Sequence, residues 1–195
     1  MGYLMVEDLE LEYKYRADNI KLGDFLELMT ALPKFRLVVA ASWDVYYMQA
    51  GNDASFQRYR MDRDRPELTK KVKVSDANNW RRVESDLPLD PARITEEKVS
   101  FHVGLDGYKR NFKIFKHCSI FFTEDLNYVY YIVFDENMKE CGRFIEVEVN
   151  KDRVKHLGTG AMEALRQGEQ YLEKLGITAQ NRLKKSLFEL YRKVS

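Results

Sequence analysis

The feature that most constrains the fold of this chain is a two-residue alternation, in which one face of a segment is apolar and the other is charged. Residues 9–16 read Leu-Glu-Leu-Glu-Tyr-Lys-Tyr-Arg, so Glu10, Glu12, Lys14 and Arg16 share one face. Successive side chains point to opposite faces of a β-strand, whereas a helix repeats every 3.6 residues. Residues 9–16 are therefore predicted to form a strand with one wholly charged face.

The same alternation recurs in at least four other segments, and their charged faces carry both signs. These sets are Arg58 with Arg60, Lys71 with Lys73, Arg82 with Glu84 and Asp86, and Glu146 with Glu148. In a half-exposed sheet such faces simply meet water, and solvated edge strands are the alternative interpretation. If the strands close into a barrel, one face of each lines the interior. That interior must then be hydrated, paired or filled by a ligand, because unpaired buried charges are costly.

The remaining segments predict an α+β domain that covers residues 1–195, with an eight-stranded antiparallel, tunnel-like barrel and flanking helices. Strands are expected at 37–48 (one or two), 56–61, 67–74, 80–87, 111–122, 128–135 and 143–149, and helices at 22–32, 161–175 and 181–194. Residues 62–66 could turn a hairpin. Residues 96–102 fit a weak strand or a helix. The apolar faces of the strands would pack against the helices, which leaves the charges inside.

Composition excludes several function classes. The net charge of +1 gives no overall field that would attract nucleic acid or an anionic membrane. No segment approaches the roughly 18 apolar residues of a membrane span, and no signal peptide is expected at the N-terminus. Two cysteines, Cys118 and Cys141, do not suggest a disulfide framework. We therefore expect a cytoplasmic protein without a membrane partner.

The charged faces themselves indicate a chemistry. Paired carboxylates suit hard, oxygen-seeking cations such as Mg²⁺ or Mn²⁺. Clustered lysines and arginines suit phosphate oxygens, which arginine can bind with two hydrogen bonds. Carboxylates and cations on one surface together predict a site for a metal and a polyphosphate.

The motifs resemble those of the CYTH superfamily, the triphosphate tunnel metalloenzymes. Glu10-Leu-Glu12-Tyr-Lys14 is similar to its ExExK signature. Further similar motifs follow in the same order: Asp44-Val-Tyr46-Tyr47, Arg58-Tyr-Arg60, Thr69-Lys-Lys71, Arg82-Val-Glu84, Asp135, and Gly142-Arg-Phe144-Ile-Glu146-Val-Glu148. The resemblance runs over nearly the whole chain. It departs from the family pattern before Asp135, where the usual arginine is missing and Lys113 or Lys116 is the basic choice, with Lys116 fitting the spacing better.

The resemblance implies a role for each of these residues. The metal ligands would be Glu10, Glu12, Asp135, Glu146 and Glu148. The substrate-binding residues would be Lys14, Arg58, Arg60, Lys71, Arg82 and Lys116. The catalytic set would be Glu10, Glu12, Lys14, Glu146 and Glu148. Arg82 and Glu84 could form an ion pair in the tunnel, or Glu84 could add a metal contact, whereas Arg16, Lys73 and Asp86 could lie at the rim.

Three activities remain open at this point. The first is a metal-dependent triphosphatase acting on inorganic triphosphate, a nucleoside triphosphate, an RNA 5′-triphosphate or thiamine triphosphate. The second is a class IV-type adenylyl cyclase, and the third is a non-catalytic binder of phosphorylated ligands. Hydrolysis is favoured, because it needs only a placed water, whereas no purine pocket is evident in the sequence. We expect a small-molecule triphosphate as the partner of a monomer or homodimer, with discrimination by phosphate count rather than by the organic group.

Overall fold

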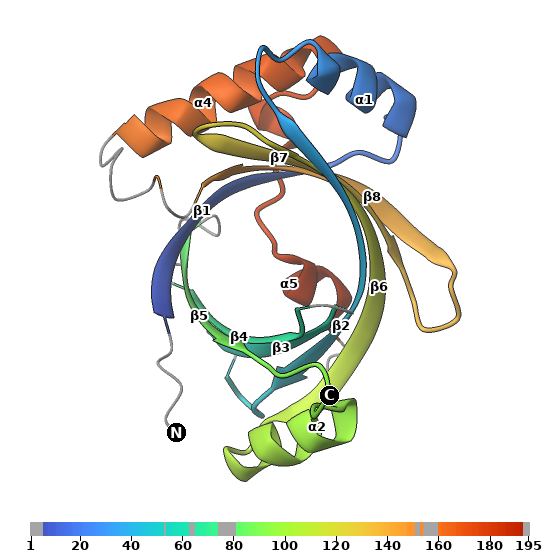
Figure 1. Ribbon diagram of the computed structural model, residues 1–195, viewed down its shortest axis with the longest axis vertical. Helices are drawn as coiled ribbons and strands as arrows, with labels where there is room; N and C mark the ends of the chain where they lie inside the picture. Colours follow the sequence, from blue (N-terminus) through green and yellow to red (C-terminus); the bar gives the residue numbers. More distant parts are fainter. Residues whose placement is uncertain are drawn as a thin grey trace.

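Eight antiparallel strands form a closed barrel in the order β1-β5-β4-β3-β2-β6-β7-β8 (Figure 1). The structure is a computed structural model that describes residues 6–52, 54–62, 65–73, 81–150, 153 and 160–192, with only the backbone of residues 6–10, 81 and 82. The strands are β1 Val6–Arg16, β2 Arg36–Met48, β3 Ser55–Met61, β4 Glu67–Lys73, β5 Arg81–Pro88, β6 Lys109–Phe122, β7 Leu126–Phe134 and β8 Glu140–Val149. The predicted fold class is confirmed.

Strand β1 closes the barrel by dividing its length between two neighbours. Its first half, Val6–Leu11, pairs with β5, and its second half, Glu12–Arg16, pairs with β8. The second half keeps the alternation that the sequence shows, so Glu12 and Lys14 face inward while Tyr13 and Tyr15 face outward. The N-terminal motif therefore lies where the two ends of the sheet meet.

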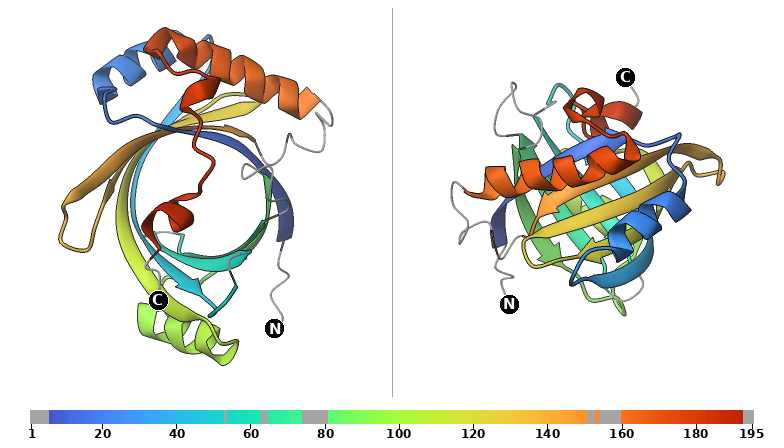
Figure 2. Two further views of the ribbon diagram at one scale, coloured as in Figure 1. Left: turned by 180° about the vertical axis from the view of Figure 1, so that it is seen from behind. Right: turned by 90° about the horizontal axis from the view of Figure 1, so that it is seen from above.

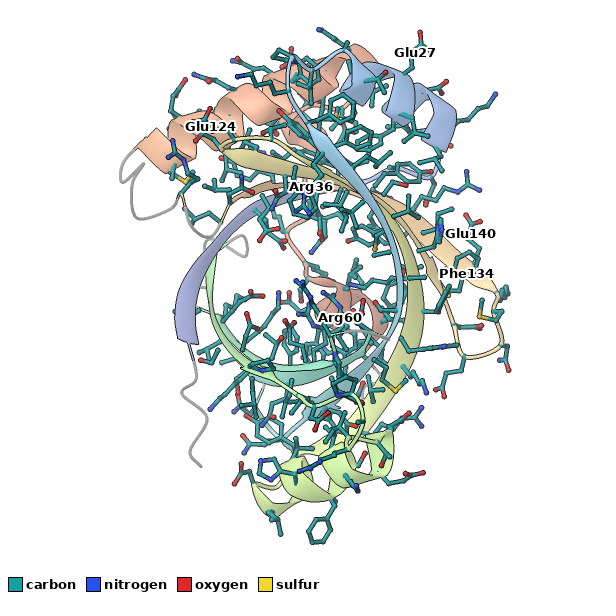
Figure 3. The ribbon with its side chains drawn as sticks, in the orientation of Figure 1. Glu27, Arg36, Arg60, Glu124, Phe134 and Glu140 are labelled. Atoms are coloured by element: carbon teal, nitrogen blue, oxygen red, sulfur yellow. The ribbon has the colours of Figure 1, made fainter. Side chains whose placement is uncertain are left out.

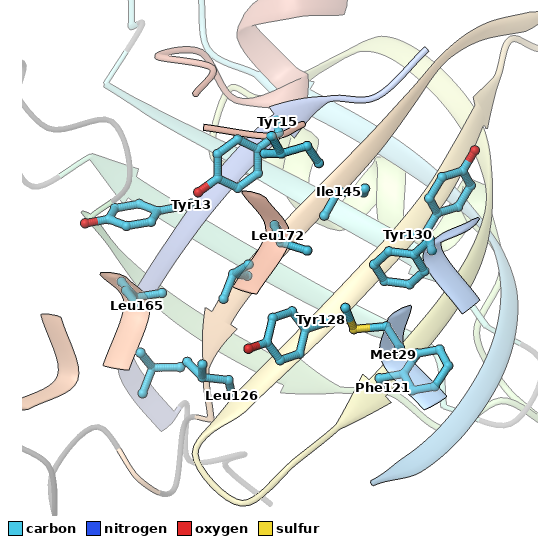
Figure 4. Packing of buried hydrophobic residues seen from close by; sticks show 14 of the residues in the cluster. Tyr13, Tyr15, Met29, Phe121, Leu126, Tyr128, Tyr130, Ile145, Leu165 and Leu172 are labelled. Atoms are coloured by element: carbon cyan, nitrogen blue, oxygen red, sulfur yellow. The ribbon is translucent and has the colours of Figure 1, made fainter. Parts of the chain in front are cut away.

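The outer face of β1, β7 and β8 is covered by two helices, α1 (Leu22–Thr30) and α4 (Gly160–Leu172) (Figures 1 and 2). The core between them contains Tyr13, Tyr15, Tyr128, Leu165 and other buried apolar side chains (Figure 4). Burial of this apolar surface contributes about 25 cal/mol per Å². This cluster thus lies between the barrel and its helices, whereas a second apolar cluster, which includes Tyr46, Phe56 and Phe188, lies at the end that the C-terminal segment closes and also lines the barrel interior.

Helix α2 (Glu96–Leu105) covers the opposite side of the barrel. The Thr95 hydroxyl accepts a hydrogen bond from the backbone N–H of Lys98 and begins the helix. Val99 and Val103 then pack in one cluster with Tyr47 of β2. Of the two alternatives for residues 96–102, the helix is correct. Residues 37–48 belong to one long strand, β2, rather than two.

The C-terminal segment closes one end of the barrel with α5 (Leu187–Tyr191), which lies across the opening in Figure 2. Between α4 and α5 come two short 3₁₀ turns, η1 (Glu173–Leu175) and η2 (Ala179–Asn181). The predicted helix over 181–194 is wrong in extent. Residues near Leu183 run alongside β1, where the Leu183 N–H donates to the Lys14 carbonyl at 2.7 Å. A helix begins only at Ser186, whose side chain and Glu189 form a capping box.

No helix within the described ranges is long and apolar enough to cross a membrane.

Candidate functional site

The barrel encloses a cavity of about 790 Å³, called here the tunnel, and about half of its lining residues are charged. Figure 3 shows Arg60 pointing into the opening. The basic lining residues are Lys14, Arg36, Arg58, Arg60, Lys71, Lys116 and Arg153, and the acidic ones are Glu12, Asp62, Glu67, Glu84, Glu124, Glu146 and Glu148. Among the described residues the two signs therefore balance. The prediction that the charged faces turn inward is confirmed for Glu12, Lys14, Arg58, Arg60, Lys71, Glu84, Glu146 and Glu148.

The first cluster of the tunnel centres on the Lys14 ammonium group. Its Nζ lies 2.9 Å from Glu12 Oε1 and 2.7 Å from Glu146 Oε1, and the Tyr131 hydroxyl donates to that same Glu146 oxygen at 2.7 Å. Burial disfavours a charged Glu146, but Lys14 outweighs burial and lowers the pKa of Glu146 to about 2. The Glu146 carboxylate is therefore ionised at neutral pH.

The second cluster centres on Asp44 of β2, whose side chain is fully buried. Arg60 donates to both carboxylate oxygens, at 2.9 and 3.1 Å, and Lys116 Nζ lies 2.7 Å from Oδ2. Burial alone would raise the pKa of Asp44, but the charges of Arg60 and then Lys116 hold it well below its usual range. Burial, and then the charge of Arg60, lower the pKa of Lys116. Asp44 thus orients two of the predicted phosphate-binding cations.

The alternative between Lys113 and Lys116 is resolved by the register of β6. Lys116 lies in the tunnel lining, opposite Ser42 on β2. Lys113 has the opposite parity, and its Nζ lies outside the barrel, 2.7 Å from Glu96 of α2 and 5.0 Å from the centre of the Trp43 ring. Lys116 is therefore the basic residue that β6 presents to a ligand.

The third cluster lies on β3, β4 and β5. Arg58 Nη2 donates to Glu67 Oε1 at 3.0 Å and to the Thr69 hydroxyl at 3.1 Å, and Lys71 forms an ion pair with Glu84. The Arg58 Nε–H group is buried and has no hydrogen-bond partner within the described part of the chain. A buried donor of this kind can serve an anionic ligand.

One predicted site residue, Asp135, is not brought to these clusters. Asp135 lies in the turn between β7 and β8, where its Oδ1 accepts the backbone N–H groups of Asn137 and Lys139 at 2.8 and 2.9 Å. An aspartate that closes a turn in this way has a structural role, and we leave it out of the candidate site. Glu10 and Arg82 belong to β1 and β5, but their side chains lie outside the described residues.

Two residues predicted for the rim lie near the end that α5 closes. Arg16 contacts Asp18 at 2.6 Å and stacks on Phe144 at 5.1 Å from the ring centre, outside the tunnel lining. Lys73 lies 3.8 Å from Glu189 of α5. Arg16 and Lys73 therefore form contacts near the end that α5 closes and not within the central clusters.

The sequence interpretation quoted Asp44 in a motif without giving it a role, and it did not single out Glu67 or Tyr131. Asp44 is the single charged residue in the apolar stretch 37–48, which is the feature that could have revealed it. An isolated carboxylate among apolar residues has to be paired if the strand is buried. Glu67 and Tyr131 became recognisable only through their contacts with Arg58 and Glu146.

A divalent metal is implied by the resemblance, and the donors in the tunnel fit it chemically. Glu12 and Glu148 are direct partners across β1 and β8, and Glu146 lies two residues from Glu148 on the same face. In the portion of the chain described, no three acidic, histidine or cysteine side chains already converge on one point. Instead, the Lys14 ammonium bridges Glu12 and Glu146. These carboxylates therefore accept a cation at this place in the tunnel.

Solved structures share this fold, although no protein-family model and no curated protein matches the chain significantly. The PH1012 protein from Pyrococcus horikoshii has 20% identity and a TM-score of 0.70, over 93% of this chain and 98% of that one. A conserved hypothetical protein from Pyrococcus furiosus has 23% identity and a TM-score of 0.69, over 93% and 99%.

A third structure, of a proposed adenylate cyclase from Vibrio parahaemolyticus, has 14% identity and a TM-score of 0.65, over 94% of this chain and 97% of that one. At these identities the similarity shows the fold alone. It confirms the tunnel fold that the resemblance to the CYTH superfamily implied.

Proposed function

We propose that this chain is a metal-dependent triphosphatase that hydrolyses a phosphoric anhydride bond in the tunnel. The observation that supports this most is the convergence of cations from four strands on one cavity beside a set of carboxylates. The cations are Lys14, Arg58, Arg60, Lys71 and Lys116, and the carboxylates are Glu12, Glu146 and Glu148. Such a lining matches the alternating needs of phosphate oxygens and a metal ion.

The balance of charge in the tunnel supports the need for a metal. The described lining already has as many acidic as basic side chains. A triphosphate brings several negative charges, and a buried excess of one sign is costly. A divalent cation that enters with the triphosphate removes two of these negative charges. Glu12, Glu146 and Glu148 would hold the metal, with Glu10 if its side chain also faces inward.

Binding a triphosphate requires the tunnel to exchange ion pairs. In the structure Arg58 is paired with Glu67, and Lys71 with Glu84. A phosphate oxygen offers either cation another anionic partner, so the net gain is smaller than the strength of the new contact alone. The unpartnered Arg58 Nε–H is an exception, since it gains a hydrogen bond without losing one.

In the proposed reaction, the oxygen of a water molecule bonds to the terminal phosphorus while the bond from that phosphorus to the bridging oxygen breaks. Orthophosphate is released, the remaining diphosphate takes the electron pair of the broken bond, and the proton that the water loses passes to solvent. Lys14, Arg60 and Lys116 would hold the phosphate oxygens and stabilise the charge that develops during transfer. A metal, when bound, supplies a Lewis acid that orients the phosphate and lowers the pKa of water.

A cyclase is the second candidate, because a protein of this fold from Vibrio parahaemolyticus is a proposed adenylate cyclase. The deciding experiment incubates the protein with inorganic triphosphate, ATP and ADP in Mg²⁺ and in Mn²⁺ and separates the products. We expect orthophosphate from the triphosphates, much slower reaction of the diphosphate, and no cyclic nucleotide. Pyrophosphate with an equal amount of cyclic AMP would establish the cyclase instead. Tight metal-dependent binding without any product would leave a non-catalytic binder.

Replacing Glu146 by Gln tests the metal assignment. The amide keeps the size of the side chain but loses the charge, so we expect Mg²⁺ affinity, measured by calorimetry, to fall and turnover to stop. The melting temperature should stay high enough for a folded protein at the assay temperature. The matched control is Glu140→Gln, which removes a carboxylate paired with Arg143 on the outside of the barrel. Unchanged metal affinity in Glu146→Gln would remove this residue from the metal site.

A further inference from the structure

Part of the tunnel wall is apolar, although phosphate and metal have no use for apolar surface. Ile120 and Phe122 of β6 and Val129 of β7 line the cavity and are only partly buried. Ile120 is the direct partner of Val129, and Phe122 is the direct partner of Asn127, which also lines the cavity. These four residues, called here the distal patch, therefore form one contiguous surface on two adjacent strands.

The distal patch lies away from the end that α5 closes. Phe188 of α5 stacks with Phe56 at 4.5 Å and lies 6.0 Å from the Phe112 ring. Phe112 belongs to the same strand as Ile120, eight residues earlier. At about 3.3 Å per residue, this separation is more than 20 Å along the strand. The C-terminal helix therefore does not account for the apolar side chains of the distal patch.

The register of the sheet sets the distal patch directly beside the proposed metal-binding carboxylates. Val129 is the partner of Glu146 on β8, and Asn127 is the partner of Glu148. Side chains opposite each other on one face of an antiparallel pair lie about 4.5–5.5 Å apart at Cβ. A triphosphate held at the carboxylates and cations would thus have its ester group within reach of this surface.

Asn127 gives the distal patch a polar group without a partner. Its Oδ1 atom is buried and accepts no hydrogen bond among the residues that the structure describes. Such an atom is costly to leave unsatisfied, and a ligand N–H or O–H would satisfy it. Beside it, the Arg36 guanidinium lies 4.4 Å from the centre of the Phe122 ring, which extends the surface with a planar group. Apolar surface with one free acceptor matches an organic ligand rather than an inorganic one.

We propose that the distal patch binds the organic group of a triphosphate monoester, and that this group is aromatic or apolar with an N–H or O–H donor. The inference rests on the proposed function, because the phosphate chain fixes where the ester begins. The chain then prefers an organic triphosphate to inorganic triphosphate. This differs from the expectation drawn from sequence, in which only the number of phosphates was recognised.

The test compares kcat/KM for inorganic triphosphate with that for a panel of esters, namely ATP, GTP, CTP, UTP and thiamine triphosphate. We expect at least one ester to exceed inorganic triphosphate by about tenfold, the effect of one buried hydrogen bond with its apolar contacts. In Asn127→Leu and in Phe122→Ala that advantage should disappear, while kcat/KM for inorganic triphosphate stays the same. The matched control, Phe134→Ala, removes an aromatic ring on the outside of β7 and should keep the preference.

Two outcomes would overturn the inference. One is that inorganic triphosphate is used at least as well as every ester, and the other is that the Asn127 variant affects both substrate classes equally. If no triphosphate is hydrolysed, the proposed function fails, and calorimetric affinities for the same compounds decide the inference separately. The inference would be supported if an ester binds more tightly than inorganic triphosphate and if Asn127→Leu removes this difference. Equal affinities for inorganic triphosphate and all esters would contradict the inference.

Discussion

Asp44 shows how a single buried carboxylate organises this tunnel. It does not face the ligand alone but holds Arg60 and Lys116, two cations that would repel each other without it. Removing one member of a buried ionic group leaves an uncompensated charge, which costs far more than the loss of an exposed pair. The fold and the proposed phosphate site are therefore coupled at this residue.

Replacing Asp44 by Asn should lower the free energy of unfolding by about 3 kcal/mol at pH 7. The pKa of Asp44 is lowered in the folded protein, so its contribution is fully present above 3.8, the ordinary value, and declines as the pH falls below it. The difference in free energy of unfolding between the unaltered protein and Asp44→Asn should therefore become smaller as the pH falls. Urea unfolding from pH 7 down to pH 3 measures it. Glu163→Gln, which removes an exposed pair with Arg166, should change stability by less than about 0.5 kcal/mol. A constant difference over the whole pH range would contradict this account.

Arg58 should contribute to triphosphate affinity through both its charge and its geometry. We expect Arg58→Ala to weaken binding by about 1.5–3 kcal/mol, the scale of a hydrogen bond to a charged group. Arg58→Lys restores the charge but not the buried Nε–H, so it should recover only part of the loss. Isothermal calorimetry with inorganic triphosphate measures both. Arg110→Ala, on the outer surface beside Glu136, should bind like the unaltered protein. Full recovery by lysine would show that only charge matters.

At the residue scale, the sequence predicted the strand face on which a side chain lies better than it predicted the residues that the side chain contacts. The alternation in residues 9–16 correctly predicted that Glu12 and Lys14 share the interior. The spacing of the motifs favoured Lys116 over Lys113, and the pairing of β6 with β2 confirms this choice by placing Lys116 in the tunnel lining. The position of Asp135 in the chain did not show that its oxygens are used by the backbone of a turn.

Helix α4 depends on a close approach to the sheet at one glycine. A Cβ atom at Gly168 would lie 2.7 Å from Val147 Cγ1 and 2.9 Å from Leu126 Cδ1, both within the core. Gly104 of α2 has no atom within 4 Å of the corresponding position. The two helical glycines therefore differ in packing, although their intrinsic helix propensity is the same.

Gly168→Ala and Gly104→Ala should differ in their effect on stability. Alanine favours a helix by about 1 kcal/mol over glycine, and this gain applies at both positions. At Gly168 the overpacked core costs typically 1–3 kcal/mol and outweighs it. We thus expect Gly168→Ala to be neutral or destabilising and Gly104→Ala to be stabilising by up to about 1 kcal/mol, as measured by urea unfolding. Equal gains in the two variants would mean that α4 can move away from β8 at little cost.

At the element scale, boundaries set by local residues were predicted well and those set by tertiary contacts were not. The predicted hairpin at residues 62–66 joins β3 and β4, and the helix predicted from Leu22 begins there. The C-terminal helix was overestimated because residues near Leu183 satisfy their backbone on β1 instead. A capping box at Ser186 then sets where α5 begins.

The order of the strands in the sheet is a property of the whole molecule, and it cannot be predicted from the alternation in the sequence. A period of two tells which face is charged but not which strand lies next to it. The resemblance to the CYTH superfamily predicted a tunnel, and the pairing of β1 with both β5 and β8 shows how the chain closes it. Closure is what converts several solvated faces into one cavity with balanced charge.

That balance leads to a prediction for the molecule as a whole. Triphosphate alone adds negative charge to a neutral tunnel, and metal alone adds positive charge, so each should bind weakly. Together they compensate, and a ligand at 100 times its Kd stabilises a protein by about 2.7 kcal/mol. For a chain of this length, that corresponds to a rise in Tm of about 5–10 °C.

Thermal unfolding with inorganic triphosphate, with Mg²⁺, and with both should show a shift for the combination well above the sum of the single shifts. Inorganic diphosphate with Mg²⁺ is the matched control and should give a smaller shift. An equal rise with triphosphate in the presence of a chelator would show that the cations of the tunnel suffice without a metal.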